Sequence, residues 1–132
     1  MVAFVRMFDE TTNGAKTPAL TLELDVEHIT IREVIRRRVC AEVEAYNTGA
    51  DRIVFRGLVT PTDAEATANG FRMPNRRQVD PDAQVKIALE AFERNGFFVL
   101  FQNRQVEDLD EVLELLQDND VSFIRLVPLV GG

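Results

Sequence analysis

The sequence predicts an α+β fold for a chain of 132 residues. Some segments alternate like strands and others repeat at helical spacing, and their order is not the regular strand–helix alternation of parallel α/β proteins. Hydrophobic residues make up 45% of the chain and charged residues 28%, which is typical of a globular protein with its own core. We expect one domain over residues 1–132, with an insertion at about 48–96.

The chain is expected to begin with a β-hairpin. Residues 2–8 are rich in apolar side chains and predict a strand. Residues 9–18 contain Asn13, Gly14 and Pro18, which favour a turn. Residues 19–27 alternate, which predicts a half-buried strand whose apolar face carries Leu20, Leu22, Leu24 and Val26.

A helix is predicted from residue 31 to about 46. Thr30 can cap its N-terminus, and Glu33 stands three residues later, the spacing of a capping box. Gly49 follows, and glycine readily takes the left-handed conformation that ends many helices. Cys40 is expected to be a small core residue. Three consecutive arginines are expected on a solvated helix face: Arg36, Arg37 and Arg38.

The expected insertion contains a strand, a loop and a second helix. Residues 52–59 predict a short strand, and residues 60–80 show no clear period and are predicted as loop. Asp80 followed by Pro81 predicts the start of a helix that ends at Asn95 and Gly96.

The last third of the chain is expected to return to the sheet. Residues 97–101 are continuously apolar, which predicts a strand buried on both faces. A tight turn at residues 102–104 leads to a short strand at 105–106. Residues 109–117 predict a short helix or helical turn, and residues 121–127 a last strand.

Composition excludes several functions. One cysteine rules out an internal disulfide and a cysteine-based zinc cluster. His28 is the only histidine and is expected at the surface, so a catalytic triad is not favoured. The acids that follow Asp108 fail the EF-hand pattern because Leu113 stands where glycine is required. We expect no metal, no cofactor and no enzymatic activity.

The net charge of −7 argues against a nucleic-acid partner. No apolar run is long enough for a membrane span, and the N-terminus lacks signal-peptide features, so we expect a cytoplasmic protein without a membrane partner. All seven acids of residues 97–132 lie between Glu107 and Asp120. A solvated acidic face is the favoured interpretation, and a docking surface for a basic partner is the alternative.

The chain ends in Gly131 and Gly132, after Pro128, Leu129 and Val130. Terminal glycines bury no side chain and add nothing to a core. A narrow tail of this kind can thread an enzyme's channel, where its carboxylate can be adenylated and passed to a thiol or an amine. The alternative is a frayed end that happens to be glycine.

Residues 97–132 resemble the second half of ubiquitin. The run from Phe97 to Phe101 corresponds to its third strand, residues 105–108 (Gln-Val-Glu-Asp) are similar to its Gln-Leu-Glu-Asp turn, and Gly131 and Gly132 match its conjugating tail. Residues 1–46 resemble its opening hairpin and main helix. The chain is therefore identified as resembling the ubiquitin-like β-grasp proteins, in particular bacterial ubiquitin-like modifiers. This resemblance implies a mixed sheet packed on a main helix.

The chain departs from ubiquitin at three places. The insertion is absent from ubiquitin, the tail carries no arginine, and Arg104 stands in the hairpin turn where ubiquitin has a chain-forming lysine. Recognition by ubiquitin's own activating enzyme and polymeric chains through position 104 are therefore not expected.

The resemblance implies a protein modifier whose Gly132 carboxylate is activated by an ATP-dependent enzyme and joined to target proteins, with a conjugating enzyme or protease as further partners. One alternative is a sulfur carrier with a C-terminal thiocarboxylate. Another is a non-conjugated binding module. The expected conjugation tail is Pro128, Leu129, Val130, Gly131 and Gly132, and the expected partner-binding surface contains Ile124, Leu126 and Arg104.

Overall fold

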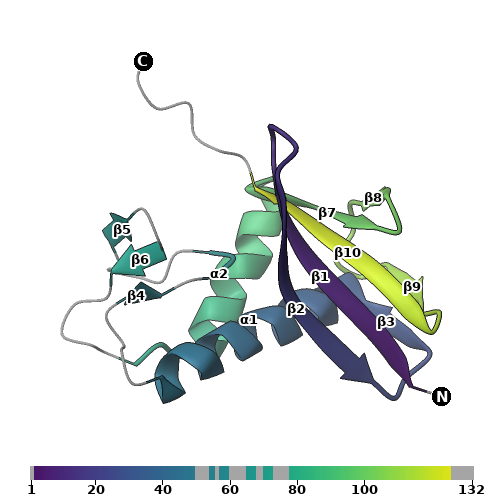
Figure 1. Ribbon diagram of the computed structural model, residues 1–132, viewed down its shortest axis with the longest axis horizontal. Helices are drawn as coiled ribbons and strands as arrows, with labels where there is room; N and C mark the ends of the chain where they lie inside the picture. The colour runs from purple at the N-terminus through teal and green to yellow at the C-terminus, as the bar shows by residue number, and fades with distance from the viewer. Residues whose placement is uncertain are drawn as a thin grey trace. The chain divides into compact units, whose positions relative to one another are not determined.

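The computed structural model has the α+β architecture expected from the sequence, and its described residues form a mixed five-stranded sheet, two smaller sheets and two helices (Figure 1). The structure describes residues 2–49, 54–55, 57–59, 65–67, 70–72 and 78–125. The chain divides into two compact units. The sheet unit comprises residues 1–33 and 92–132, and the helical unit comprises residues 34–91.

The sheet unit is built on a five-stranded sheet with the order β2–β1–β10–β7–β8. The strands are β1 (Ala3–Thr11), β2 (Lys16–Leu24), β7 (Phe97–Phe101), β8 (Arg104–Val106) and β10 (Asp118–Arg125). β1 pairs with β10 in parallel, and all the other neighbours pair antiparallel. The first and last strands of the unit are therefore side by side in the middle of the sheet (Figure 1).

The opening hairpin is confirmed, but its strands are longer at the turn than the sequence predicts. Residues expected as turn belong to strands, because Asp9 and Glu10 pair with Thr17 and Lys16. The remaining turn uses Gly14 at φ 91°, which a glycine adopts without strain. Pro18 is accommodated because β2 is an edge strand. Val26 lies beyond β2 and is exposed, so its expected place on the apolar face is wrong.

The hairpin of β7 and β8 turns through Gln102 and Asn103, both at positive φ. Two consecutive residues of this kind match the twist of antiparallel strands. The apolar run of β7 is not buried on both faces as expected. Phe97, Val99 and Phe101 are buried, whereas Phe98 and Leu100 are only half-buried, because the two faces of a strand meet different surroundings.

The helical turn predicted for residues 109–117 is wrong. A backbone turn joins Asp108 to Glu111, and the chain then forms β9 (Val112–Glu114). This strand pairs antiparallel with β3 (His28–Thr30), which the sequence did not predict. Leu113 is buried with Leu115, while Val112 and Leu116 are exposed. This segment forms a strand and not a helical turn because it pairs with β3, and its side chains therefore alternate between buried and exposed.

Alternating side chains form the core of the sheet unit. β1 contributes Ala3, Val5 and Met7, all of them buried. Phe97 stacks at an angle against Phe92 and Phe123, with ring centroids 5.9 and 6.1 Å apart. Tilted aromatic pairs at this spacing add to the energy of burial.

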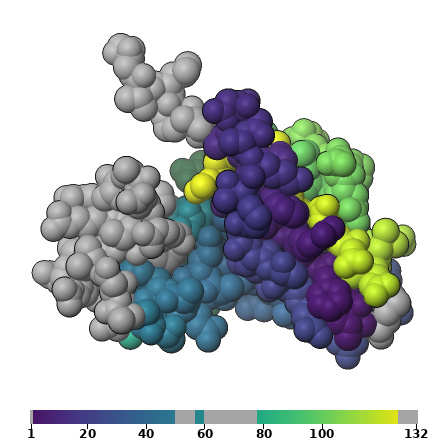
Figure 2. Space-filling model, viewed as in Figure 1, coloured from purple at the N-terminus to yellow at the C-terminus, as the bar shows by residue number. Residues whose placement is uncertain are grey.

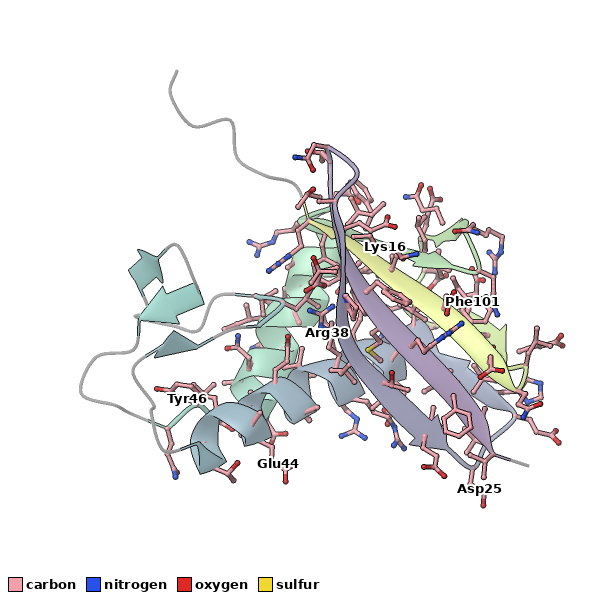
Figure 3. All side chains as sticks on the ribbon, viewed as in Figure 1. Lys16, Asp25, Arg38, Glu44, Tyr46 and Phe101 are labelled. Carbon is pink, nitrogen blue, oxygen red and sulfur yellow. The ribbon has the colours of Figure 1, made fainter. Side chains whose placement is uncertain are left out.

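The first helix, α1 (Ile31–Thr48), begins as predicted: the Glu33 amide donates to Thr30 Oγ1 at 3.1 Å. Gly49 is not left-handed, and its amide donates to the Tyr46 carbonyl instead. Cys40 is half-buried rather than a core residue. The expected solvated arginine face is wrong at Arg38, which is 1% exposed and is labelled in Figure 3.

Arg38 is stabilised inside the helical unit by Glu42. The Arg38 guanidinium lies 3.3 Å from Glu42 Oε2, and the Leu58 amide donates to Glu42 Oε1 at 3.0 Å. The carboxylate therefore has two partners: Arg38, one helical turn before it on α1, and the Leu58 amide. These contacts offset part of the free-energy cost of removing the Arg38 charge from water.

The second helix, α2 (Pro81–Glu93), follows the predicted cap: the Asp82 amide donates to Asp80 Oδ1. Asn95 ends the helix at positive φ. Between the helices lie β4 (Val54–Phe55), β5 (Glu65–Thr67) and β6 (Gly70–Arg72) in a three-stranded sheet. Of the predicted strand 52–59, the described residues 54–55 form β4 and residues 57–59 do not belong to a strand. The described residues of the predicted loop 60–80 include β5 and β6, because cross-strand pairing is not visible in local periodicity.

Two side-chain amides connect α1 and α2 to the segments between them. Asn47 exchanges two hydrogen bonds of 2.9 Å with the backbone of Val79. Gln84, which is buried, donates to the Val59 carbonyl at 2.8 Å.

Within the part of the chain that the structure describes, no helix is long and apolar enough to cross a membrane.

Candidate functional site

The candidate site begins with the outer face of the five-stranded sheet, opposite the side chains of Val5, Met7 and Phe123. Side chains alternate between the faces of a strand, so Phe4, Arg6 and Phe8 of β1 lie on this outer face. Figure 2 shows the β1–β2 hairpin, coloured purple, at the molecular surface.

Four apolar residues form a cluster on the outer face: Phe8, Phe98, Leu100 and Ile124, here called the outer-face cluster. The register places Ser122 between Phe8 and Leu100, and Ile124 beside Phe98. All four cluster residues are half-buried. Ser122 is 6% exposed although it is polar, because larger side chains stand on both sides of it. The centre of the outer face is therefore apolar across three adjacent strands.

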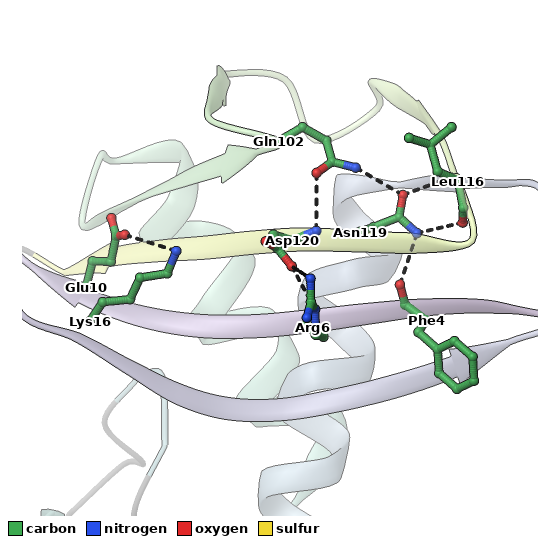
Figure 4. A network of polar contacts seen from close by, with 8 residues as sticks. All are labelled: Phe4, Arg6, Glu10, Lys16, Gln102, Leu116, Asn119 and Asp120. Carbon is green, nitrogen blue, oxygen red and sulfur yellow. Dashed lines mark hydrogen bonds and ion pairs between the residues drawn. The ribbon is translucent and has the colours of Figure 1, made fainter.

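Charged side chains border this cluster, and Figure 4 shows two of their ion pairs, Lys16 with Glu10 and Arg6 with Asp120. The Lys16 ammonium lies 4.5 Å from the centre of the Phe8 ring and 3.8 Å from Glu10 Oε1. An ammonium over an aromatic face contributes about 0.5–1 kcal/mol at an exposed site. One row further, Arg6 forms a 2.9 Å ion pair with Asp120. The cluster thus has the apolar centre and polar rim that are typical of protein-binding surfaces.

The structure does not bring Arg104 and Ile124 together. Arg104 pairs across the hairpin with Phe101, so its side chain starts on the face opposite the outer-face cluster. Its guanidinium forms a 2.7 Å ion pair with Glu111. Gln105 is the residue of β8 that lies beside Leu100. Of the expected partner-binding residues in the described part of the chain, only Ile124 lies on this apolar face.

The expected tail lies outside the described residues. Leu126, Pro128, Leu129, Val130, Gly131 and Gly132 all follow the last described residue, Arg125. Arg125 lies 3.7 Å from the carboxylate of Asp9 and pairs with Thr11. The strand that leads to the tail is therefore held by β1 up to its last described residue.

Groups able to carry out chemistry are few among the described residues. Among them, no group of three or more His, Cys, Asp or Glu side chains is arranged to hold a metal ion. His28 is exposed on β3, as expected, opposite Glu114. Cys40 lies half-buried on α1.

The sequence analysis missed three of the four cluster residues: Phe8, Phe98 and Leu100. A usable signal was present, because period-two alternation separates Phe98 and Leu100 from the buried members of β7. The missing information was the register that joins these positions to Phe8 and Ile124.

Comparisons of the chain with known protein families, with curated proteins and with solved structures found no match.

Proposed function

We propose that the chain is a ubiquitin-like modifier of the β-grasp type, whose Gly132 carboxyl group is joined to amines of target proteins. The observation that carries this proposal is the mixed sheet. One sheet contains the opening hairpin (β1 and β2), the strand that starts at Phe97 (β7), the short strand after the turn (β8) and the last strand (β10). This is the set of strands that the resemblance to ubiquitin requires. A helix follows the hairpin in sequence, as the resemblance also requires.

The position of the last strand supports the proposed role of the tail. β10 pairs on one side with β1 and on the other with β7. Arg125, its last residue, is paired with Thr11 and is close to Asp9. A tail that leaves a strand paired on both sides starts from a defined point, which reduces the conformational entropy that a partner enzyme must remove.

The proposed chemistry uses the carboxylate of this chain and the catalytic groups of its partners. The Gly132 carboxylate attacks the α-phosphorus of ATP, and pyrophosphate leaves. A thiolate of the activating enzyme then displaces AMP, and a target amine displaces the thiolate to form an amide. Glycine suits both displacements because no side chain hinders the approach to the carbonyl carbon.

A second candidate function, a binding module without conjugation, is favoured by the outer-face cluster. Its apolar side chains lie across β1, β10 and β7 and are bordered by Lys16 and Arg6. A modifier also needs a surface that its readers contact. The cluster is therefore compatible with both functions, and the test must separate them.

The test is mass spectrometry of an N-terminally tagged copy expressed in its host and purified under denaturing conditions. The intact mass first establishes the residue at which the chain ends. Trypsin then cleaves after Arg125, so a conjugated tail leaves residues 126–132 on a target amine. We expect this remnant on other proteins, and its loss when Gly132 is deleted.

The control is Ile124→Ser, which alters the outer-face cluster and leaves the tail unchanged. A remnant that persists without Gly132 would contradict the proposal. A free carboxylate alone, with partner binding that depends on Ile124, would establish the binding module. Replacement of one carboxyl oxygen by sulfur would indicate a sulfur carrier instead.

A further inference from the structure

The exposed large hydrophobic residues of the described chain all belong to the sheet unit. Each lies at or near the end of a strand. They are Val2, Val26, Val112 and Leu116, with exposed fractions of 39, 44, 55 and 64%. None of them belongs to the outer-face cluster. Figure 1 shows the start of β1, the start of β3 and the turn from β9 to β10 at the same end of the sheet. We call these four residues the Leu116 surface.

Strand register brings the Leu116 surface together. In the β3–β9 pair, His28 lies opposite Glu114, and the Leu115 amide donates to the Glu27 carbonyl at 2.9 Å. Continuing this pairing by one residue places Leu116 opposite Val26. In the parallel β1–β10 pair, Phe4 lies opposite Asp118, and the Phe4 amide donates to the Gln117 carbonyl. Continuing this pairing backwards places Leu116 beside Val2.

Val112 joins the surface through alternation along one segment. Leu113 and Leu115 are buried, whereas Val112, Glu114 and Leu116 are exposed. Successive side chains of an extended segment project to opposite sides. The outward side of this segment therefore carries two apolar side chains with an acid between them.

Leu116 is held in its exposed position by a buried side chain. Asn119 is 1% exposed. Its Oδ1 accepts from the Leu116 amide at 2.8 Å, and its Nδ2 donates to the carbonyls of Leu116 and Phe4 at 2.9 and 3.0 Å. Figure 4 shows these bonds, together with one from Gln102 to Asn119. The turn is thus tied to β1, and the exposure of Leu116 is part of the folded structure.

The surroundings of this surface are acidic. Glu114 and Asp118 are exposed and each stands two residues from Leu116 along the chain, and among the described residues neither side chain takes part in an ion pair. The sheet unit as a whole holds 14 acidic and 6 basic residues, a formal net charge of −8 within a chain of −7. Charge complementarity therefore favours a cationic partner.

We propose that the Leu116 surface binds a segment of a partner protein that is rich in lysine or arginine and carries apolar side chains. The apolar side chains of the segment cover Val26, Val112 and Leu116, and its cations face the acids around them. A second copy of this chain would bring the same acids together, and an anionic membrane would be repelled. Like charges across an interface disfavour both alternatives.

This surface is separate from the proposed conjugation tail. β10 runs from Asp118, next to the Leu116 surface, to Arg125, which precedes the tail. Eight residues of extended chain span about 26 Å. A partner on the Leu116 surface would therefore contact the end of β10 that is remote from Arg125, and the inference does not depend on conjugation.

The test uses the full chain and a synthetic peptide in which lysine and leucine alternate. We expect binding by calorimetry, with backbone amide shifts in NMR spectra confined to residues 2–4, 24–30 and 110–119. Leu116→Ser should weaken binding by about tenfold or more, as expected for a central apolar contact. Ala83→Ser, an exposed change on α2 outside both apolar surfaces, should leave the affinity within about twofold. Glu114→Gln should weaken binding more than Glu90→Gln, which removes an exposed acid of α2.

Two further peptides separate the contributions of charge and apolar contact. A lysine–serine peptide should bind more weakly, and a glutamate–leucine peptide should not bind. Equal affinity of the wild type and Leu116→Ser would overturn the proposal, as would shifts distributed over all acidic surfaces. Concentration-dependent shifts of residues 110–119 without peptide would indicate self-association, and binding to anionic vesicles would indicate a lipid surface. Either result would also overturn it.

Discussion

Replacing Asn119 by alanine should destabilise the protein strongly for a single polar side chain. Asn119 makes three hydrogen bonds of 3.0 Å or less to the backbone of Leu116 and Phe4. Each such bond contributes about 1 kcal/mol net. The backbone groups of Leu116 can regain water because that residue is exposed, which reduces the loss. We therefore expect the free energy of unfolding to fall by about 2–3 kcal/mol.

The measurement is urea unfolding followed by circular dichroism, with the wild type and Gln102→Ala as references. Gln102 makes only longer bonds in this network, 3.3 Å to Asn119 and 3.4 Å from the Asp120 amide. Its removal should cost less than about 1 kcal/mol. Asn119→Asp keeps the acceptor for Leu116 but turns a carboxylate oxygen toward the carbonyls of Leu116 and Phe4, so it should destabilise the protein at least as much as the alanine variant.

The reasoning would be refuted if Asn119→Ala lowered the free energy of unfolding by less than about 0.5 kcal/mol, or by no more than Gln102→Ala. If Asn119→Ala lowered the free energy of unfolding by about 3 kcal/mol but Leu116 stayed equally exposed, Asn119 would be shown to stabilise the fold. The claim that Asn119 holds Leu116 in its exposed position would then be wrong. Hydrogen exchange of the Leu116 amide distinguishes these cases. In the alanine variant this amide loses its acceptor and should exchange faster.

Three further predictions concern other parts of the fold. Arg38→Ala should cost about 3–5 kcal/mol in urea unfolding, because it leaves the Glu42 carboxylate without its buried cation, whereas the exposed Lys86→Ala should change stability by less than about 0.5 kcal/mol. Phe123→Ala should lower the free energy of unfolding by about 3–5 kcal/mol, since Phe123 is fully buried; a loss below about 1 kcal/mol would contradict the packing. Asn103→Val should cost about 1 kcal/mol or more, because a β-branched residue is strained at φ 66°, and thermal unfolding would detect it as a lower Tm.

Features decided by neighbouring residues were predictable from the sequence. The Thr30 cap, the turn at Gly14 and the start of α2 after Asp80 all depend on bonds or conformations within a few residues. Alternation also identified the strand containing Leu20, Leu22 and Leu24, because one face of that strand meets the core.

The segment 109–117 was not predictable because its apolar residues fit two periods. As a helix it would place Leu109, Val112 and Leu116 on one stripe. As a strand it buries Leu113 and Leu115. The choice depends on pairing with β3, some eighty residues earlier in the chain, and no local signal contains that information.

The candidate site was predictable only in part, for the same reason. Ile124 was expected at a surface, but its neighbours Phe8 and Phe98 come from distant strands. Arg38 was expected in solvent, because the sequence gives no sign that Glu42 and the Leu58 amide would compensate its burial.

The sequence by itself determined the α+β class, the position of the helices and several strands, the acidic character of the chain and the residues of the proposed tail. Tertiary structure alone decided which apolar residues meet. Long-range register made one cluster of Phe8, Phe98, Leu100 and Ile124, and a second surface of Val2, Val26, Val112 and Leu116. The physical reason is that hydrogen-bonded pairing between strands, with side chains alternating at every residue, assigns each side chain to a face.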